Sequence, residues 1–181
     1  MNAPVEIIAQ FKKFEKLKES TLEYIEEIER TYKEDLIRLD RSQIPLQIDP
    51  RQDDMWHSAS WLKPNMMESD YSTILPRFKE SIFEELIESI PTKVCRARIM
   101  ILKAGTAHQI HVDDYPRIHV PIITHSECAF LFPDDDYMKH MSANGNVYWA
   151  NVTKRHTFVN WGNQPRIHLL MSIVDKNYKL I

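Results

Sequence analysis

The side chains best suited to metal chemistry in this 181-residue sequence are His111, Asp113 and His156. Neutral imidazole nitrogens and a carboxylate oxygen suit ferrous iron, and the carboxylate lowers the net charge of the site. Three protein ligands of this kind occupy one face of an octahedral ion and leave the opposite face open. These residues therefore predict a non-haem iron site that can bind substrate and oxygen.

Strands are expected to position these groups. Residues two apart in an extended segment project to the same face, so His111 and Asp113 are expected at the end of one strand. His156 and Arg166 each open an apolar run that is typical of a strand. The Arg166 guanidinium can hold a carboxylate through two parallel hydrogen bonds. A dicarboxylate co-substrate bound to the metal would need such a contact.

Beyond these residues, the chain resembles a known group of enzymes over residues 94–175, a little under half of its length. This stretch looks like the catalytic core of the aspartyl/asparaginyl β-hydroxylase group of 2-oxoglutarate-dependent oxygenases, and it is also similar to bacterial free-proline hydroxylases. The shared motifs are residues 96–105, 111–113, 117–122, 146–149 and 156–168. A His-x-Asp pair alone is a weak signal, but its combination with Arg-x-His-Val-Pro, a distal His and a following Arg is specific.

This resemblance implies both the site and the reaction. His111, Asp113 and His156 are implied as the iron ligands and catalytic residues. Arg166 is implied as the residue that binds the distal carboxylate of 2-oxoglutarate, and His119, with Arg117, is implied to lie near this co-substrate. The implied reaction consumes oxygen and 2-oxoglutarate, releases succinate and CO2, and hydroxylates an amino-acid residue or a free amino acid of the aspartyl/asparaginyl or prolyl type.

The register of the first iron ligand has an alternative. Some members of the group hold the metal with two histidines, and a gapless comparison with them would choose His108 in place of His111. We prefer His111 because only this histidine has a carboxylate two residues further on. Asp114, the next acid, would fall on the opposite face of a strand.

Two further residues near the predicted site have open roles. Arg117 can contact the co-substrate, or it can pair with Asp113 or Asp114 and orient a metal ligand. His168 shares the strand face of Arg166, so a role in the pocket is conceivable. These alternatives stay open at the level of sequence.

Two other functions fit parts of the pattern. A non-catalytic, cupin-like protein that binds a small molecule would keep the fold but would need neither an open metal position nor the distal arginine. A metal-dependent enzyme that does not use 2-oxoglutarate, such as an isomerase or a thiol dioxygenase, would also lack that arginine. Arg166 is therefore the residue that separates the three functions.

Composition restricts the partners. The formal net charge is −3 and the pI is near 6.2, so charge gives no reason to expect general attraction to nucleic acid or membranes. No apolar run approaches the ~20 residues that span a bilayer, and Glu6 stands where a signal peptide would be basic. We therefore expect a cytoplasmic protein. The resemblance implies that its partner is an amino acid, peptide or protein substrate. Cys95 and Cys128 are expected as buried free thiols.

The first half of the chain is expected to be helical and irregular. Residues 5–39 carry apolar positions at spacings of three and four, which predicts one or two amphipathic helices, and residues 74–90 predict another that stops at Pro91. Residues 41–72 predict loops and short strands. Within them Arg51, Trp56, His57 and Trp61 are candidates to line the substrate mouth, because loops on a rigid scaffold often carry specificity.

The second half is expected to form a barrel. After Pro91 the chain shows short β-branched and aromatic runs separated by turn residues, which predicts a mainly β fold of the double-stranded β-helix type, a cupin-like jelly roll. Trp149 and Trp161 are expected in its core. We predict a single domain in which residues 1–91 supply helices and loops that pack on the barrel and residues 92–176 form the catalytic core.

Overall fold

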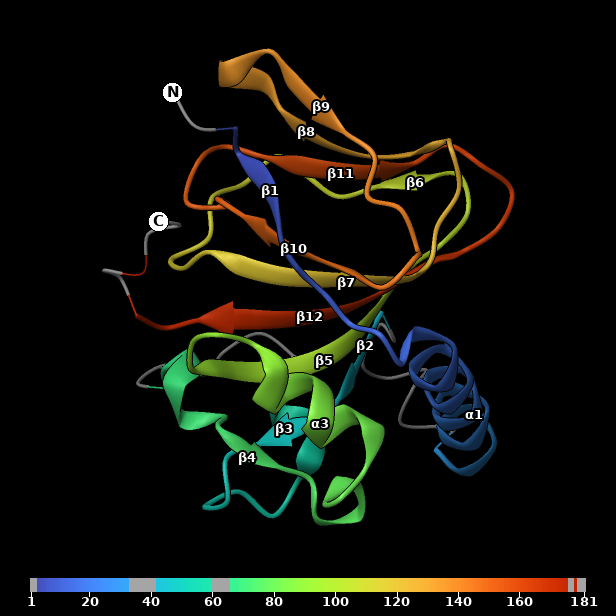
Figure 1. Cartoon of the computed structure of the whole chain (residues 1–181), viewed down its shortest axis with the longest axis vertical. Coiled ribbons are helices and arrows are strands. Elements are labelled where there is room, and N and C mark those ends of the chain that lie inside the picture. Colours follow the sequence, from blue (N-terminus) through green and yellow to red (C-terminus); the bar gives the residue numbers. More distant parts are fainter. Residues whose placement is uncertain (1–2, 33–41, 60–65, 176–177, 179–181) are drawn as a thin grey trace.

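The computed structural model describes residues 3–32, 42–59, 66–175 and 178 (Figure 1). Two antiparallel sheets form the jelly roll that the sequence predicts. The larger sheet has, in spatial order, β1 (Val5–Gln10), β10 (Asn146–Ala150), β7 (Arg117–Ile123), β12 (Arg166–Ile173), β5 (Val94–Leu102) and β2 (Gln43–Pro45). The smaller sheet has β6 (Thr106–Ala107), β11 (Thr157–Asn160), β8 (Cys128–Phe132) and β9 (Tyr137–Lys139).

The larger sheet has two faces of opposite chemistry. Side chains alternate along a strand, so every second residue of β12 faces the same layer. Ile167, Leu169 and Met171 belong to the main apolar cluster, together with Ile118 and Val120 of β7. The alternate residues project to the other side and are polar and buried: Arg96, Arg98, Arg117, His119, Arg166, His168 and Ser172. One face of the larger sheet is therefore hydrophobic and the other is polar.

Helices cover the hydrophobic face. Helix α1 (Phe14–Thr31) buries Phe14, Leu17 and Ile28, and these side chains join the apolar cluster of the sheet. Helix α3 (Ile82–Ser89) begins after Ser81, whose hydroxyl accepts a hydrogen bond from the backbone N–H of Phe83, as expected of an N-cap. Both helices lie at the opposite end of the molecule from β8 and β9 (Figure 1). The apolar side chains of α1 therefore pack against the hydrophobic face of the larger sheet.

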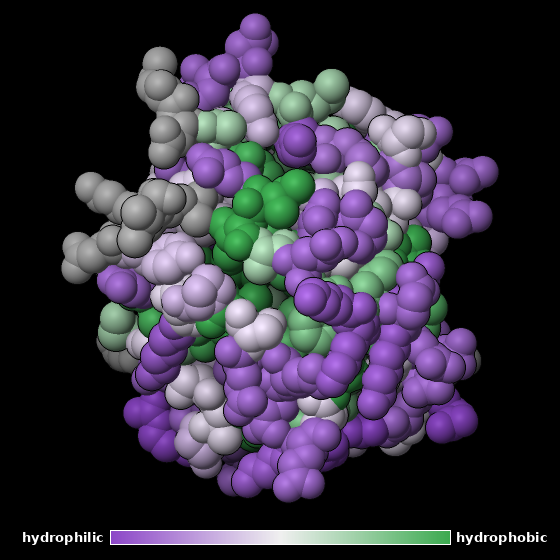
Figure 2. Space-filling model, viewed as in Figure 1, coloured by the Kyte–Doolittle hydropathy of each residue, from purple (hydrophilic) through white to green (hydrophobic). Residues whose placement is uncertain are grey.

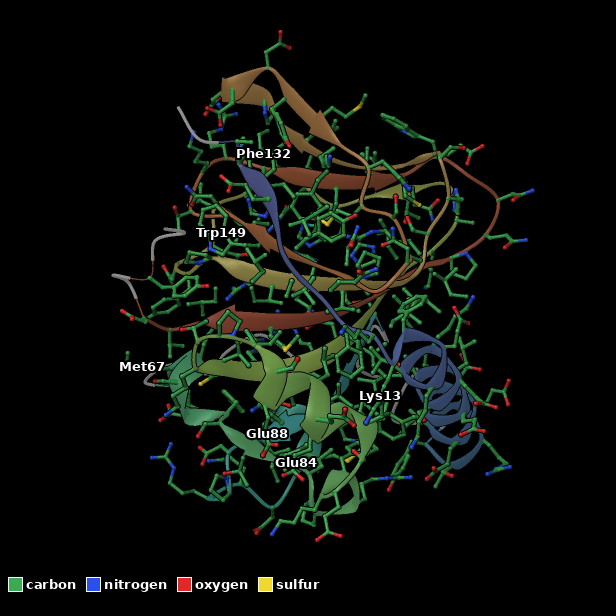
Figure 3. All side chains as sticks on the ribbon, in the orientation of Figure 1. Lys13, Met67, Glu84, Glu88, Phe132 and Trp149 are labelled. Atoms are coloured by element: carbon green, nitrogen blue, oxygen red, sulfur yellow. The ribbon has the colours of Figure 1, made fainter. Side chains whose placement is uncertain are left out.

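Aromatic side chains of the smaller sheet lie opposite the polar face of the larger sheet. A second apolar cluster contains Phe130 and Phe132 of β8 and Phe158 of β11, together with Tyr148 and Ala150 of the larger sheet. Phe132 is fully buried and lies between the two sheets (Figure 3). The barrel interior thus combines aromatic rings on one side with arginines and histidines on the other.

Two predicted helices are shorter than expected. Residues 5–10 form the edge strand β1, which pairs with β10, so the first helix begins only at Phe14; residues 33–39 lie outside the described part of the chain. In the second pattern, Pro76–Phe78 form a 3-10 turn, and Glu80 has a positive φ of 60°. Because Pro76 donates no backbone N–H and Glu80 is left-handed, the α-helix cannot start before residue 82.

The region between the helical patterns is irregular, as predicted. It contains the short strand pair β3 (Gln47–Ile48) and β4 (Thr73–Ile74) and the 3-10 turns Met55–Ala59 and Glu68–Asp70. A fourth such turn, Pro133–Asp135, connects β8 to β9. Residues 60–65 of this region are not among the described residues.

Core predictions are confirmed for the cysteines and wrong for one tryptophan. Cys95 and Cys128 are buried free thiols, and Trp149 packs against the main cluster. Trp161, by contrast, is 62% exposed because it follows the last residue of β11 and lies outside the sheet.

The face of the molecule seen in Figure 2 is mostly hydrophilic, with hydrophobic side chains visible mainly near its centre. Lys13, Glu84 and Glu88 of the helical end are among the labelled side chains of that face (Figure 3). Within the described ranges, no helix is long and apolar enough to cross a membrane. The cytoplasmic location stays a prediction.

Candidate metal centre and co-substrate pocket

The three predicted metal ligands converge. One ligand atom from each of His111, Asp113 and His156 lies within 4.8 Å of the other two. An isolated antiparallel bridge produces this meeting, because the His111 N–H donates to the His156 carbonyl at 3.0 Å and the His156 N–H donates back at 2.9 Å. His111 and Asp113 therefore lie in a bridge and the turn after it, and not at the end of a regular strand as the sequence suggested.

The imidazole rings are oriented for metal binding. Nδ1 of His111 lies 2.9 Å from the Gln109 carbonyl, and Nδ1 of His156 lies 3.0 Å from the Lys154 carbonyl. A carbonyl can only accept, so each Nδ1 carries the proton and each Nε2 keeps its lone pair. Burial lowers the pKa of His156, which favours the neutral form that a metal requires.

His108 is a neighbour of the converging set. Its ring stacks on Phe158 at 4.9 Å between centroids, and its Nδ1 lies 3.3 Å from Nδ1 of His111. Among the described residues, the group of ligand atoms that meets at one point contains His111 and not His108. This geometry favours the register that includes His111.

Arg117 bridges the metal site and a buried carboxylate that the sequence did not reveal. Its Nη2 donates to Oδ1 of Asp113 at 3.1 Å and to Oε1 of Glu68 at 2.9 Å. Its Nη1 donates to Oε2 of Glu68 and, at 2.6 Å, to the Ser172 hydroxyl. Of the two contacts weighed for Arg117, the structure therefore contains the pair with Asp113.

Glu68 is ionised despite its burial. Burial alone would raise the pKa of this carboxyl, but Arg117 and Arg98 outweigh that effect and hold the pKa at about 2. Arg96 also donates to Glu68, from Nη1 at 2.8 Å. The sequence does not indicate a role for Glu68, because this residue lies in a short 3-10 turn. Nothing in its local pattern predicts its contact with Arg117, which is 49 residues further along the chain.

Arg166 lies inside the barrel with unused donors. Its side chain is buried, and its Nη2 donates to Nδ1 of His168 at 2.9 Å. The guanidinium carbon lies 5.2 Å from the centre of the Phe158 ring and 5.8 Å from that of Phe130. Among the described residues, Nη1 of Arg166, Nε2 of His168 and both ring nitrogens of His119 are buried without a hydrogen-bond partner.

The protonation states of Arg166, His119 and His168 favour the binding of an anion. Burial lowers the pKa of Arg166 to about 10, so its guanidinium stays charged at neutral pH. Burial and the nearby Arg166 hold the pKa values of His119 and His168 well below the ordinary value, so both rings are neutral. Because Nδ1 of His168 accepts from Arg166, its Nε2 carries the proton and is a second unused donor. A buried carboxylate would satisfy these donors.

Two of the residues expected to line the substrate mouth, Trp56 and Arg51, make structural contacts. Trp56 is buried in the main apolar cluster and its ring meets that of Tyr32 edge to face at 5.7 Å. Arg51 forms ion pairs with Asp49 and Asp70, at 2.8 and 2.9 Å. Trp61 lies outside the described residues. The structure therefore gives Trp56 a packing role that loop position alone did not indicate.

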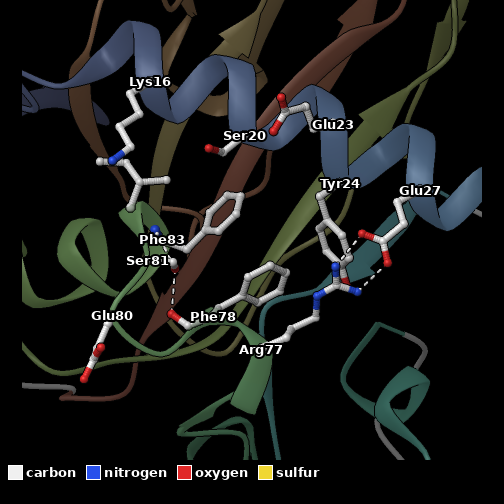
Figure 4. Close-up of a pocket in the computed structure, with 11 residues that line it drawn as sticks. Lys16, Ser20, Glu23, Tyr24, Glu27, Arg77, Phe78, Glu80, Ser81 and Phe83 are labelled. Atoms are coloured by element: carbon white, nitrogen blue, oxygen red, sulfur yellow. Dashed lines mark hydrogen bonds and ion pairs between the residues drawn. The ribbon is translucent and has the colours of Figure 1, made fainter.

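A separate hollow lies on the helical layer. It is lined by α1 and by residues 77–83, and the Arg77–Glu27 ion pair closes one side (Figure 4). The Arg77 guanidinium also lies over the Tyr24 ring, 4.9 Å from its centroid. None of the residues that line this hollow belongs to the metal-binding set.

Comparison with solved structures returns distant matches. The viral collagen prolyl hydroxylase of Paramecium bursaria Chlorella virus 1, in its 2OG complex, is 14% identical with a TM-score of 0.44, over 95% of this chain and 98% of that one. A truncated form of the same enzyme is 11% identical with a TM-score of 0.45, over 94% and 90%. A cupin domain of Bordetella pertussis Tohama I is 14% identical with a TM-score of 0.38, over 47% and 86%.

The family is established by sequence. No curated protein matches the chain. A family model described as aspartyl/asparaginyl beta-hydroxylase matches residues 14–176, which is most of the chain. This match confirms the resemblance and extends it over α1 and the irregular region. The chain belongs to the aspartyl/asparaginyl β-hydroxylase family.

Proposed function

We propose that this protein is an Fe(II)- and 2-oxoglutarate-dependent dioxygenase that hydroxylates an amino-acid residue or a free amino acid. The observation that carries the proposal is the presence of two sites in one barrel. A converging His111, Asp113 and His156 set suits a metal ion, and a buried Arg166 offers charged, unused donors to a carboxylate. Membership of a hydroxylase family supports the same reaction type.

The donor set fits ferrous iron. Two imidazole nitrogens and one carboxylate are the ligands of non-haem iron oxygenases that leave coordination positions open. When bound, iron together with 2-oxoglutarate would supply the activation of oxygen, with release of succinate and CO2. The chain's own contribution is to fix the two Nε2 lone pairs through backbone carbonyls and to fix Asp113 through Arg117.

Buried donors in the same barrel could bind the co-substrate. Arg166 would bind the distal carboxylate of 2-oxoglutarate, with His119 as a neighbouring donor. His168 would add its Nε2–H and hold the guanidinium in place. The donors of Arg117 point to Glu68, Ser172 and Asp113, so we propose that it acts on the co-substrate site through the metal ligand. Phe130 and Phe158 would exclude water from this pocket.

Succinate formation tests the proposal. Anaerobically purified, iron-loaded protein is exposed to oxygen with 2-oxoglutarate, first alone and then with amino acids and peptides, beside His111→Ala and Arg166→Ala. We expect succinate from the wild type and none from either variant. The compounds that stimulate turnover would identify the substrate.

The same experiment separates the alternative, a non-catalytic cupin-like binding protein. That protein would bind a small molecule without consuming 2-oxoglutarate. Absence of succinate under every condition, together with no calorimetric binding of 2-oxoglutarate to the iron form, would favour the alternative and contradict the proposal.

A further inference from the structure

We propose that Glu68 is a positioning residue for the metal ligand Asp113 and that it acts through Arg117. The inference rests on the proposed metal site and adds to it a residue outside the barrel strands. It assigns a role in metal binding to the irregular region that precedes the catalytic core.

The turn that carries Glu68 is held rigidly. Within Glu68–Asp70, the carboxylate of Asp70 accepts from the Met67 N–H at 2.7 Å, and the Tyr71 N–H donates back to the Glu68 carbonyl at 3.2 Å. The Tyr71 carbonyl in turn accepts from the Arg96 N–H of β5 at 2.7 Å. The Glu68 side chain is therefore presented to the barrel interior from a fixed backbone, and it is only 4% exposed.

Arg117 transmits this position to the metal ligand. Its planar guanidinium contacts both oxygens of Glu68 and one oxygen of Asp113, so the orientation of one carboxylate restricts the other. Because Oδ1 of Asp113 is held by Arg117, Oδ2 is the oxygen left for the metal. Oδ2 lies 3.9 Å from Nε2 of His156, on the side where the ligand atoms meet.

Charge gives Glu68 a second effect on Asp113. Arg96, Arg98 and Arg117 are all buried around this carboxylate. Arg98 is fully buried, and within the described residues its Nε has no partner. If Glu68 lost its charge, Asp113 would be the acid left to balance these guanidinium groups. Asp113 would then be drawn into an ion pair and would bind a metal less well.

The experiment measures Co²⁺ binding by calorimetry, since cobalt is an oxygen-stable substitute for ferrous iron in N/O sites. Glu68→Gln keeps the size and an acceptor but removes the charge. We expect its affinity for Co²⁺ to fall by about 10- to 100-fold, the usual effect of a residue that orients a metal ligand. Glu27→Gln, which removes a carboxylate from the surface pair with Arg77, is the matched control and should leave affinity unchanged.

A double-mutant cycle distinguishes positioning from general destabilisation. In an Asp113→Asn background, where two histidines still bind Co²⁺ weakly, Glu68→Gln should cause no further loss of affinity. The visible spectrum of bound Co²⁺ should change in Glu68→Gln and stay unchanged in Glu27→Gln. An equal loss in both backgrounds, or unchanged affinity in Glu68→Gln, would overturn the inference.

If Glu68→Gln does not fold, Arg117→Lys enters the same cycle, because lysine keeps the charge but cannot bridge two carboxylates. A loss of Co²⁺ affinity that occurs only where Asp113 is intact supports the inference. An equal loss in the Asp113→Asn background contradicts it. Absence of the proposed metal site gives a different result, since the wild type itself would then bind no Co²⁺ and the role of Glu68 would fall with it. A metal site that does not use 2-oxoglutarate would still bind Co²⁺ but form no succinate, which would contradict the proposed function and leave the test of Glu68 intact.

Discussion

Two buried polar clusters share the interior of this barrel and differ in whether they contain a carboxylate that accepts from their donors. In the first, both oxygens of Glu68 accept from Arg117, and Arg96 adds a third donor. In the second, Arg166 and His168 bond to each other, while Nη1 of Arg166, Nε2 of His168 and the His119 nitrogens have no partner among the described residues. The first cluster contains its own carboxylate, and the second does not.

This difference distinguishes a cluster that supports the fold from a cluster that can bind a ligand. Buried polar groups are almost always hydrogen-bonded, so a cluster that contains a fully paired carboxylate can serve the fold. A cluster of donors that lacks an acceptor is costly unless a ligand supplies one. We therefore assign the Glu68 cluster to holding the metal ligand and the Arg166 cluster to holding the co-substrate.

The largest expected effect is on the stability of the protein when the Glu68 cluster loses its carboxylate. Glu68→Ala would leave three buried arginines short of a carboxylate, and removal of one partner from a buried ion pair costs about 3–5 kcal/mol. We expect the free energy of unfolding to fall by about this amount in urea. Glu127→Ala, which removes an exposed carboxylate near His125, should leave it almost unchanged. Equal losses in the two variants would remove the distinction between buried and surface carboxylates.

The next largest effect is expected in the Arg166 cluster, which contains no carboxylate. Arg166→Gln removes the charged donor, and we expect 2-oxoglutarate to bind the metal-loaded protein at least about 100-fold more weakly, or about 2.7 kcal/mol. The free energy of unfolding without ligand should hardly change, because no acid is left unpaired. Calorimetry and urea unfolding of the same preparation would check both. Unaltered 2-oxoglutarate affinity would contradict the assignment of this cluster.

Acid should affect the two clusters differently. The pKa of Glu68 is about 2, so its charge is constant between pH 7 and pH 5. The folded pKa values of His119 and His168 lie well below 6.5 because of burial, so the unfolded chain binds more protons as the pH falls. Their stabilisation is therefore complete above about pH 6.5 and declines as the pH falls below it.

Urea unfolding of metal-free protein at pH 7 and pH 5 measures this decline. His168→Asn should lose part of the pH dependence, since asparagine does not titrate. The same pH dependence in wild type and variant would show that His168 is not a buried neutral group.

The smallest expected effect is on the fine positioning of Arg166. His168→Asn should weaken 2-oxoglutarate binding by about tenfold, or about 1.4 kcal/mol, because Arg166 loses the acceptor that orients its guanidinium. Metal affinity should stay unchanged, because His168 is not in the converging set. A similar loss of metal affinity in His168→Asn would indicate a non-specific effect.

Sequence predicted what depends on local pattern. The alternation along β12 and the spacing of apolar residues in α1 could be read directly, and the chemistry of His111, Asp113 and His156 needs no structure to be recognised. The first strand was missed because β1 lies at a sheet edge, where only Val5 is fully buried and alternation is weak. Glu68 and the packing of Trp56 were missed because both depend on contacts distant in the chain.

The most direct test of this account is the visible spectrum of the anaerobic iron-loaded protein during titration with 2-oxoglutarate. A charge-transfer absorption arises only if the co-substrate's 2-oxo acid group chelates the iron. The account predicts that this band appears in the wild type, is absent in His156→Ala, and needs much more 2-oxoglutarate in Arg166→Gln. Iron binding without any such band in the wild type would contradict the assignment of the Arg166 cluster to the co-substrate.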